Sequence, residues 1–455
     1  MTEVIEAPPT LIPMTHQIKM AELGRNNKRW GHWLEPGTGK TIGTLMIVEE
    51  HPIKTVVVCP KSVMKAAWVT DCENFFPHLS IACCWANSKK KRMKLIEGDQ
   101  LISVINIDLF KKHRQDFINN GVRRLVFDES SMGKNHKAQR TKAIIEFADQ
   151  MESVHLLSGI PAPNCPTEYY TQIRAINKHI FGPSFYGFAA RYFYPVTRPI
   201  HGKDVITGYK IRTDRASEFY EKLESCSWSL AKEDAIDLPP KTDVLRLVDL
   251  DPKDRATYDT IYAGMVAEME GEILSPSAQA KAMKLRQICN GFYYRGEETL
   301  FTHKNPKLLE LGNLLDELGR EQVIIWRSFV AEKDILSTFL AKRGATYMAI
   351  DSSNSDECIK AFQAGDVQYL LCNPDSVGHG ITITAASYAI YYSLGHSYDK
   401  HSQSKDRNYR VGQTRPCTYY YLLADNTIEK HILWLVRNKA KLSDAILRML
   451  KQPPN

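Results

Sequence analysis

The segment HWLEPGTGKT, which ends at Thr41, combines residue types that bind nucleotide phosphates. Gly37 and Gly39 let the backbone bend so that N–H groups point inward around phosphate oxygens. Lys40 can reach the β- and γ-phosphates, and the hydroxyl of Thr41 can hold a magnesium ion. The strict pattern G-x-x-x-x-G-K-[ST] fails because Leu34 replaces its first glycine, so a non-functional glycine-rich turn stays open as the alternative.

An acidic pair, Asp128 and Glu129, follows the apolar segment RRLVF. Ligands bind at the carboxyl ends of the strands in a parallel sheet, so the pair is well placed for chemistry. One carboxylate can hold magnesium through water, and the other can polarise the attacking water. Taken alone, the pair could equally cap a helix. Its position after a phosphate loop favours the catalytic interpretation.

Two arginines, Arg407 and Arg410, lie in the segment SQSKDRNYRVGQT at 402–414. A spacing of three places them on one face if the segment is helical. Such a pair can neutralise charge on a transferring phosphoryl group. A solvated surface and a salt bridge between two lobes are the alternatives that this segment alone leaves open.

Short apolar runs rich in β-branched residues alternate with amphipathic stretches, and these are the elements that must position the candidate residues. Runs this apolar, bounded by turns and separated by helices, indicate parallel sheets covered on both faces. The expected strands are 55–60, 101–107, 124–130, 154–159, 322–328, 345–351, 367–373 and 388–393. Expected helices include 41–50 and 331–344. The fold class is therefore α/β.

The pattern changes between about 165 and 305, where the sequence is rich in aromatic residues and mostly helical in period. The segment DLPPK at 237–241 contains a Pro-Pro pair that cannot continue a helix, which makes it a candidate linker. We expect two α/β lobes, 1–238 and 239–455, with helical insertions between their sheets. The aromatic stripe at 180–195 is expected to be a core between helices rather than a surface that stacks on bases.

Composition sets limits on the class of protein. The 455 residues suffice for two large domains, and the net charge of +7 fits a polyanionic partner without requiring one. None of the ten cysteines forms a Cys-x-x-Cys pair, so we expect reduced, mostly buried thiols in an intracellular protein. The N-terminus has no pattern of a secretory signal, and no apolar run approaches the roughly 18 residues of a membrane span.

In their order along the chain, these segments resemble the superfamily-two helicases, and most closely the Swi/Snf (Snf-two) ATPases. The resemblance covers about Leu11 to Leu435 and is most specific in the forms LRQICN and DRxxRxGQ. The matching segments are PMTHQ (glutamine motif), LEPGTGKT (motif I), VVVCPKSVMKAAW (motif Ia), DESS (DEAH-type box), LLSGIPAPN (motif III), LRQICNGF, VIIWRSF (motif IV), SVGHGITITAASYAIYYSLGHS (motif V and its extension) and QSKDRNYRVGQT (motif VI).

The resemblance implies two RecA-like lobes, ATP and Mg²⁺ as cofactors, and a role for each matching residue. The nucleotide would be bound by Gln17 (at the adenine), Gly37, Thr38, Gly39, Lys40, Thr41, Asp128 and Gly380, the last in a motif V loop that also holds Gly378. The metal would be bound by Thr41 and Asp128. Catalysis would depend on Lys40, on Glu129 as base, and on Arg407 and Arg410 as arginine fingers.

Three departures from the family pattern bear on how the nucleotide site is coupled to the bound DNA. Leu34-Glu35-Pro36 replaces the usual lead into motif I, and Ile160 replaces a threonine in motif III. Ser130-Ser131 replaces Ala-His, which removes an imidazole that in relatives links the nucleotide site to the DNA-facing side. The residues that perform the chemistry are all present.

The resemblance implies an ATP hydrolase that translocates on double-stranded DNA as its two lobes close and open. A strand-separating DNA or RNA helicase and a nucleotide-dependent DNA clamp with little turnover are the alternatives. The basic residues at 89–92 and 111–114, with Lys61, could contact phosphates or could be solvated faces. We expect a monomer that needs no membrane and has room for a protein partner. It would be cytoplasmic in a bacterial or virus-infected host cell, or nuclear in a eukaryote.

Overall fold

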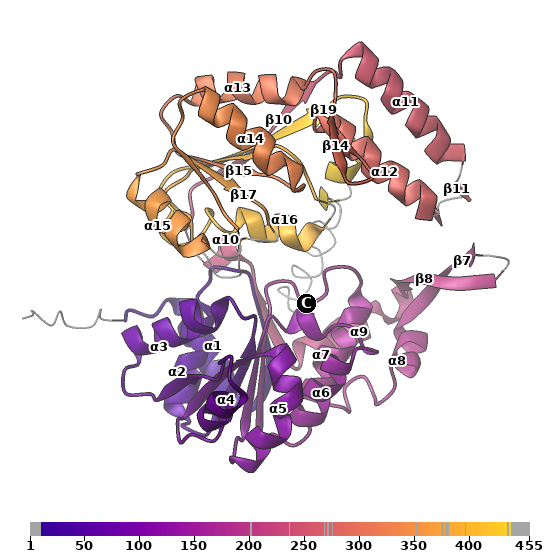
Figure 1. Cartoon of the computed structure of the whole chain (residues 1–455). Helices are drawn as coiled ribbons and strands as arrows, with labels where there is room; N and C mark the ends of the chain where they lie inside the picture. The colour runs from indigo at the N-terminus through magenta and orange to yellow at the C-terminus, as the bar shows by residue number, and fades with distance from the viewer. Residues whose placement is uncertain are drawn as a thin grey trace, which may run out of the picture. The chain divides into compact units, whose positions relative to one another are not determined.

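The computed structural model describes residues 11–437 except 201–202, 236, 268, 271–272, 275, 352–353, 375–376, 378–381, 396 and 435 (Figure 1). The chain divides into two compact units, the first ending at Asp237 and the second beginning at Leu238. Each unit is built on its own parallel sheet with helices around it, which confirms the expected α/β class and the two parallel-sheet lobes. No helix in the described part of the chain is long and apolar enough to span a membrane.

The first unit has a seven-stranded sheet in the order β3-β4-β2-β5-β6-β1-β9, and every neighbouring pair is parallel. Its strands are β1 (Arg29–Leu34), β2 (Thr55–Cys59), β3 (Ile81–Cys83), β4 (Ile102–Asn106), β5 (Arg124–Asp128), β6 (Ser153–Leu157) and β9 (Ser227–Leu230). Its helices are α1 (Thr15–Asn26), α2 (Lys40–Glu50), α3 (Thr70–Phe75), α4 (Lys89–Ile96), α5 (Ile107–Asn119), α6 (Gln139–Ala148), α7 (Tyr169–Ile176), α8 (Phe185–Tyr192), α9 (Ala216–Glu224) and α10 (Lys232–Ala235). A separate antiparallel hairpin joins β7 (Phe193–Ile200) and β8 (Lys203–Ile211).

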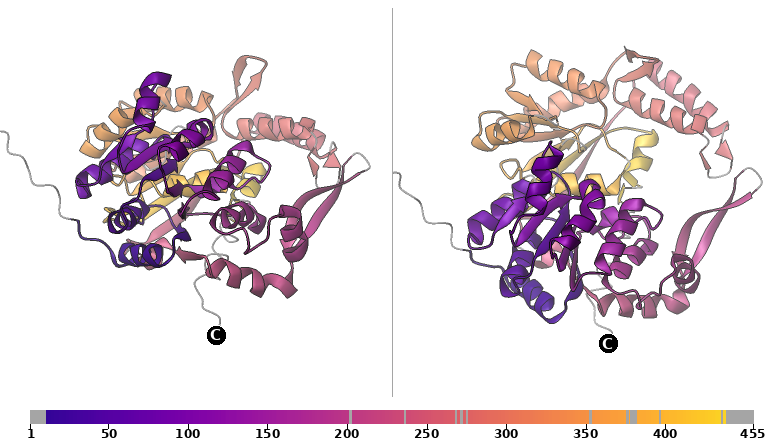
Figure 2. Two further views of the ribbon diagram at one scale, coloured as in Figure 1. Left: turned by 90° about the horizontal axis from the view of Figure 1, so that it is seen from below. Right: turned by 60° about the horizontal axis from the view of Figure 1, so that its bottom comes forward.

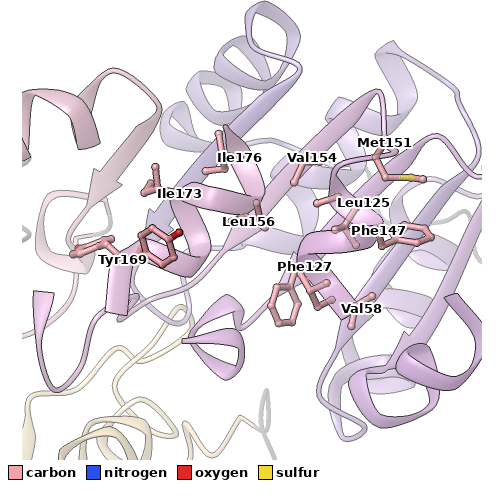
Figure 3. Close-up of a cluster of buried hydrophobic side chains, with 14 of the residues drawn as sticks. Val58, Leu125, Phe127, Phe147, Met151, Val154, Leu156, Tyr169, Ile173 and Ile176 are labelled. Atoms are coloured by element: carbon pink, nitrogen blue, oxygen red, sulfur yellow. The ribbon is translucent and has the colours of Figure 1, made fainter. Parts of the chain in front are cut away.

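Alternate residues of one central strand serve two hydrophobic cores. Val56 and Val58 of β2 pack in the core on one face of the sheet, while Val57 packs in the core on the other. Figure 3 shows part of the first core, in which Phe127 and Phe147 lie with other buried side chains from β2, β5, β6 and their covering helices. Because both faces are buried, the strand needs apolar residues at every position, which explains its continuous apolar run.

Buried polar side chains connect the neighbouring strands β1, β6 and β5 of the first sheet. His32 Nε2 lies 3.3 Å from His155 Nδ1, and His155 Nε2 lies 3.1 Å from the hydroxyl of Ser153. Arg124 Nε donates to that hydroxyl at 3.3 Å. All four residues are buried. Burial lowers the pKa of His32 to about 3 and, with the nearby His32 and Arg124, lowers that of His155 well below 6.5, so both imidazoles are neutral.

We expect acid to destabilise the first unit through this pair. Unfolded histidines titrate near pH 6.5 while the folded pair resists protonation, so stability is complete above that pH and falls as pH drops toward 3. For His32 the loss by pH 5 is about 2 kcal/mol. Urea unfolding at pH 7.5 and pH 5 should show that His32→Gln loses about 2 kcal/mol less than the wild type. An equal pH dependence in the two proteins would exclude His32 as the titrating group.

The second unit has a six-stranded parallel sheet in the order β10-β19-β18-β15-β17-β16. Its strands are β10 (Lys241–Val248), β15 (Val323–Trp326), β16 (Tyr347–Ala349), β17 (Tyr369–Cys372), β18 (Tyr388–Tyr391) and β19 (Cys417–Ala424). Its helices are α11 (Pro252–Ala267), α12 (Pro276–Cys289), α13 (Pro306–Leu318), α14 (Ala331–Lys342), α15 (Ser355–Ala364) and α16 (Tyr398–Lys405). Two small hairpins pair β11 (Met269–Glu270) with β12 (Ile273–Leu274), and β13 (Phe292–Arg295) with β14 (Glu298–Phe301).

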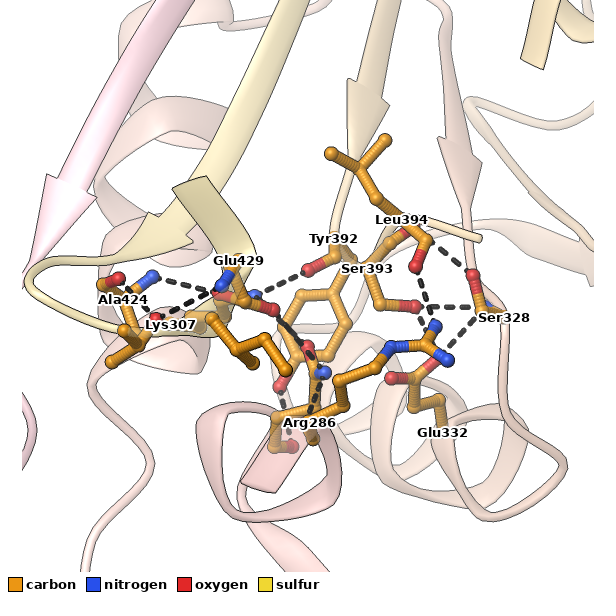
Figure 4. A network of polar contacts seen from close by, with 12 residues as sticks. Arg286, Lys307, Ser328, Glu332, Tyr392, Ser393, Leu394, Ala424 and Glu429 are labelled. Atoms are coloured by element: carbon orange, nitrogen blue, oxygen red, sulfur yellow. Dashed lines mark hydrogen bonds and ion pairs between the residues drawn. The ribbon is translucent and has the colours of Figure 1, made fainter. Parts of the chain in front are cut away.

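A buried polar network fastens the segment LRQICN to the second sheet (Figure 4). Lys307 Nζ forms an ion pair of 2.6 Å with Glu429 and donates to Asn290 Oδ1 at 2.9 Å. Arg286 donates to the carbonyl of Leu394 at 2.6 Å. Since Lys307 is fully buried, its charge depends on this set of partners. The family-like segment thus anchors α12 to the sheet within this unit.

The expectation that 165–305 is mostly helical is wrong for the part that forms strands. Helix α8 ends at Tyr192, and the chain continues as the strand β7. Two prolines, Pro195 and Pro199, and the β-branched Val196 and Thr197 disfavour a helix there.

The core interpretation of the aromatic stripe is confirmed for Phe181, Phe188, Tyr192 and Phe193, which are buried together. Tyr186 is 65% exposed. All ten cysteines are free thiols and most are buried, as the sequence predicted.

Candidate nucleotide-binding site

The glycine-rich loop leaves β1 and enters α2 in a tight left-handed bend. Gly37 has a φ of 85° and Gly39 a φ of 73°, a region where other residues are strained. The hydroxyl of Thr38 donates to the carbonyl of Glu35 at 2.8 Å and closes the bend. The two glycines are therefore required by the backbone path itself.

Lys40 and Thr41 begin helix α2 directly after this bend. The ammonium of Lys40 donates to the carbonyl of Leu34 at 2.9 Å and to that of Glu35 at 3.4 Å. Lys40 thus lies over the loop, at the N-terminus of a helix whose partial positive charge favours anions.

The start of α1 packs on the loop. His16 Nε2 lies 2.7 Å from the carbonyl oxygen of Thr38, and Gln17 Nε2 donates to the carbonyl of Gly39 at 3.5 Å. The backbone N–H of Met14 donates to Gln17 Oε1 at 2.9 Å and fixes the side-chain amide. A Cβ at Gly39 would lie 2.1 Å from Gln17 Nε2. Gln17 and the loop therefore interlock, as the assignment of both to one nucleotide site requires.

Asp128 and Glu129 lie at the carboxyl end of β5, separated from the end of β1 only by β6. Burial and the neighbouring Glu129 raise the pKa of Asp128, while Lys40 and the hydrogen bond from Trp68 oppose the rise. Trp68 Nε1 donates to Asp128 Oδ2 at 3.0 Å. Glu129 has a φ of 53°, in the left-handed region, which is uncommon for a residue other than glycine and costly to maintain. The two carboxylates and the loop lysine thus form one electrostatically coupled group.

A buried amide bridges the acidic box and motif III. The hydroxyl of Ser130 donates to Gln172 Oε1 at 2.7 Å, and Gln172 Nε2 donates to the carbonyl of Pro161 at 2.7 Å. At the other side of the same segment, a Cβ at Gly159 would lie 2.5 Å from Pro36 in the phosphate loop. Ser130 replaces the usual alanine of the family, and in this chain it connects the acidic box to motif III through Gln172.

We expect Gln172→Leu to destabilise the first unit by about 1–3 kcal/mol, because Ser130 and Pro161 would each keep a buried polar group without its partner. Gln150→Leu is the matched control, since Gln150 is exposed on the same unit. It should change the free energy of unfolding by less than about 0.5 kcal/mol. Urea unfolding measures both, and equal stabilities would show that the bridge contributes nothing.

The paired arginines lie in the second unit. Helix α16 ends at Lys405, so Arg407 and Arg410 occupy the turn that follows rather than one face of a helix. Arg407 is buried, and its carbonyl accepts a hydrogen bond of 2.7 Å from the N–H of Ile383.

Two residues that the sequence analysis did not single out hold this turn. Gln413 donates to the carbonyls of Thr384 and Ala386, each at 3.1 Å, and the amide of Asn408 donates to Ala386 at 3.3 Å. The motif VI pattern itself, DRNYRVGQT, contained both.

The structure unites some of the candidate residues and not others. The carboxyl edge of the first sheet brings together Gln17, the loop from Gly37 to Thr41, and the pair Asp128 and Glu129. Gly378 and Gly380 lie outside the described residues.

Several of the basic candidates have partners within the first unit. Arg92 donates to His113 Nε2 at 3.2 Å, and Lys61 lies 4.1 Å from the ring centroid of Trp85. These contacts favour a structural interpretation for Arg92 and His113.

The residues at the edge fit a magnesium ion bound with a nucleotide. Thr41 and Asp128 offer oxygen donors, and Mg²⁺ is usually bound by one or two protein oxygens with substrate phosphates and waters. Asp128 is held in place by the indole of Trp68. The donor set therefore suits a nucleotide-borne metal better than a dedicated protein cage.

Family models match most of the chain. Residues 32–293 match the SNF2-related domain, and residues 306–412 match the helicase conserved C-terminal domain. The chain is 24% identical over 422 residues to the SWI/SNF-related matrix-associated actin-dependent regulator of chromatin subfamily A-like protein 1 of Drosophila melanogaster, which covers 90% of this chain and 52% of the relative.

A bacterial protein is similar to the same degree. YwqA of Bacillus subtilis, named as an ATP-dependent helicase/translocase, is 24% identical over 444 residues, covering 90% of this chain and 46% of the relative. The chain thus spans about half the length of the relatives it matches. Among solved structures, the Sulfolobus solfataricus SWI2/SNF2 ATPase core in complex with dsDNA is 20% identical, with a TM-score of 0.44 over 100% of this chain and 97% of that chain.

Proposed function

Because this chain belongs to the SNF2-related family, we propose that it is a DNA-dependent ATPase that translocates along double-stranded DNA. The observation that carries the proposal is that the candidate residues meet at the carboxyl edge of the first sheet. There Gln17 interlocks with the phosphate loop, and Lys40 is electrostatically coupled to Asp128. This is the arrangement that phosphoryl transfer to water needs: a phosphate cradle, a metal-binding carboxylate and an adjacent base.

In the proposed reaction, each residue has one task. The loop N–H groups and Lys40 hold the β- and γ-phosphates, and Thr41 with Asp128 would hold Mg²⁺. The bound ion would neutralise charge that develops on the phosphate oxygens. Glu129 takes a proton from the attacking water. Arg407 and Arg410 neutralise charge on the transferring phosphoryl group.

Duplex DNA is the proposed track because the forms LRQICN and DRxxRxGQ are those of the Snf-type branch, and one relative carries the name helicase/translocase. A strand-separating helicase would use the same ATPase site and is the second candidate. We propose that the chain acts as a monomer, in the cytoplasm of a bacterial or virus-infected cell or in a eukaryotic nucleus, with a protein partner as an additional regulator.

The deciding experiment is the steady-state ATPase rate without nucleic acid and with duplex DNA, single-stranded DNA or RNA, each at low and moderate salt. Strong stimulation by duplex DNA that weakens with salt supports the proposal. Stimulation mainly by single strands or RNA favours the helicase, and a fork-unwinding assay then separates the two. A flat, slow rate with every nucleic acid would favour a DNA clamp and overturn the proposal.

A further inference from the structure

The described part of the β7–β8 hairpin contacts the rest of the first unit at its base. There the inward face packs on α8: the rings of Phe193 and Phe188 lie 5.4 Å apart, and those of Tyr209 and Phe185 lie 6.1 Å apart. Figures 1 and 2 show the two strands continuing outward from α8 and α9. The aromatic core thus fixes the direction of the hairpin.

Beyond the base, the described residues of the hairpin include exposed side chains on both faces. A bulge lies between Val196 and Thr197. Val205 and Ile206 are consecutive residues of β8, so their side chains point to opposite faces. They are nevertheless 41% and 51% exposed. An isolated two-stranded ribbon is only marginally stable, and an exposed ribbon with β-branched side chains on both faces usually marks a contact surface.

The outward face at the base is basic and aromatic. Tyr194 and Lys210 are directly paired, so they share this face, and both are exposed. The guanidinium of Arg212 lies 4.8 Å from the ring centroid of Tyr194 and donates to the carboxylate of Asp214 at 3.4 Å. The face is open further along, where a Cβ at Gly208 would meet no atom within 4 Å. Lys210 is the exposed cation of this face, because Arg212 is half-buried and ion-paired with Asp214. An exposed aromatic ring beside an exposed lysine suits a polyanion.

The charge of the hairpin favours DNA over a protein as the partner that binds its outward face. The sequence from Phe193 to Arg212 contains four lysines or arginines and one acidic residue. A basic two-stranded ribbon also has the right dimensions for the major groove of B-DNA, which admits such a ribbon. A second copy of this chain would bring the same positive charge and would be repelled.

We propose that the β7–β8 hairpin is a DNA-contacting ribbon that lies against duplex DNA through Tyr194, Lys210 and Arg212. The proposal rests on the duplex-DNA function proposed above and adds a contact surface outside the family motifs. The contact is to phosphates and groove walls, so it adds affinity without sequence specificity.

The test measures affinity for a duplex oligonucleotide by fluorescence anisotropy at several salt concentrations. Lys210→Ala should bind about tenfold more weakly near 0.1 M salt, and its salt slope should fall by about 0.9, the value for one lost phosphate contact. Tyr194→Ala should weaken binding with little change in slope. Lys178→Ala is the matched control, since Lys178 is an exposed lysine of the same unit. It should match the wild type.

The outcomes distinguish this proposal from the proposed function. If the wild type does not bind duplex DNA, the proposed function itself fails. If the wild type binds but Lys210→Ala and Tyr194→Ala keep its affinity and salt slope, the hairpin proposal is overturned and the function stands. Wild-type DNA binding by these variants, together with loss of self-association in Ile206→Asp, would make the hairpin a protein contact instead. Thermal unfolding at the wild-type midpoint checks that each variant is folded.

Discussion

Lys40→Ala abolishes ATP hydrolysis and weakens nucleotide binding. The alanine leaves the loop N–H groups in place but removes the only side-chain cation at the start of α2, where it would neutralise the β- and γ-phosphates. Loss of one such electrostatic contact costs about 10²–10³-fold in turnover. Single-turnover hydrolysis and binding of a fluorescent ATP analogue measure the two effects separately.

The matched control is Lys94→Ala, which removes an exposed lysine from α4 in the same unit. Its DNA-free hydrolysis should equal that of the wild type. If Lys40→Ala also hydrolyses ATP at the wild-type rate, the glycine-rich turn is not a phosphate loop, and the assignment of the whole edge fails.

Glu129→Gln keeps ATP binding yet stops hydrolysis, and it traps a DNA-bound state. Glutamine preserves the size of the side chain but cannot accept the proton of the attacking water. The change also removes the negative charge that raises the pKa of Asp128, so Asp128 becomes more fully ionised for magnesium. We expect turnover to fall by about 10²–10⁴-fold, the usual contribution of a general base.

Nucleotide binding and hydrolysis must be measured on the same preparation. Retained binding of the ATP analogue with no phosphate release supports Glu129 as the base. Loss of analogue binding would instead mean that Glu129, with its left-handed backbone, shapes the loop and has a structural role. Glu146→Gln is the control, because it removes the negative charge of an exposed glutamate on α6.

The sequence predicted central strands such as β2, β15 and β17 because these strands are buried at every position. It did not predict β10, whose side chains are largely exposed. A strand such as β2 must be apolar at every position, and that continuous run is visible without a structure. The start of the β7–β8 hairpin was not predicted because Phe193 continues the aromatic run of α8, with Phe188 and Tyr192, and packs in the same core. A high content of aromatic residues indicates that a segment is buried, but it does not show whether the segment is a helix or a strand.

The candidate site was predictable where one motif holds several functional residues, as in the phosphate loop. It was not predictable where a partner comes from far along the chain. Trp68 reaches Asp128 from 60 residues away, and Gln172 reaches Ser130 from 42 residues away. Such pairs are set by how helices dock on the sheet, and no local pattern encodes them.

The ion pair of Lys307 and Glu429 has a consequence for the synthesis of the protein. The two residues are 122 positions apart, and the ammonium is completely enclosed in the finished second unit. While the chain grows from the ribosome, α13 emerges long before its counter-charge. An ammonium without that partner resists leaving water, so we expect α13 to dock fully only after Glu429 has been made. The packing of Lys307 in the second unit would then be completed only after β19 is translated.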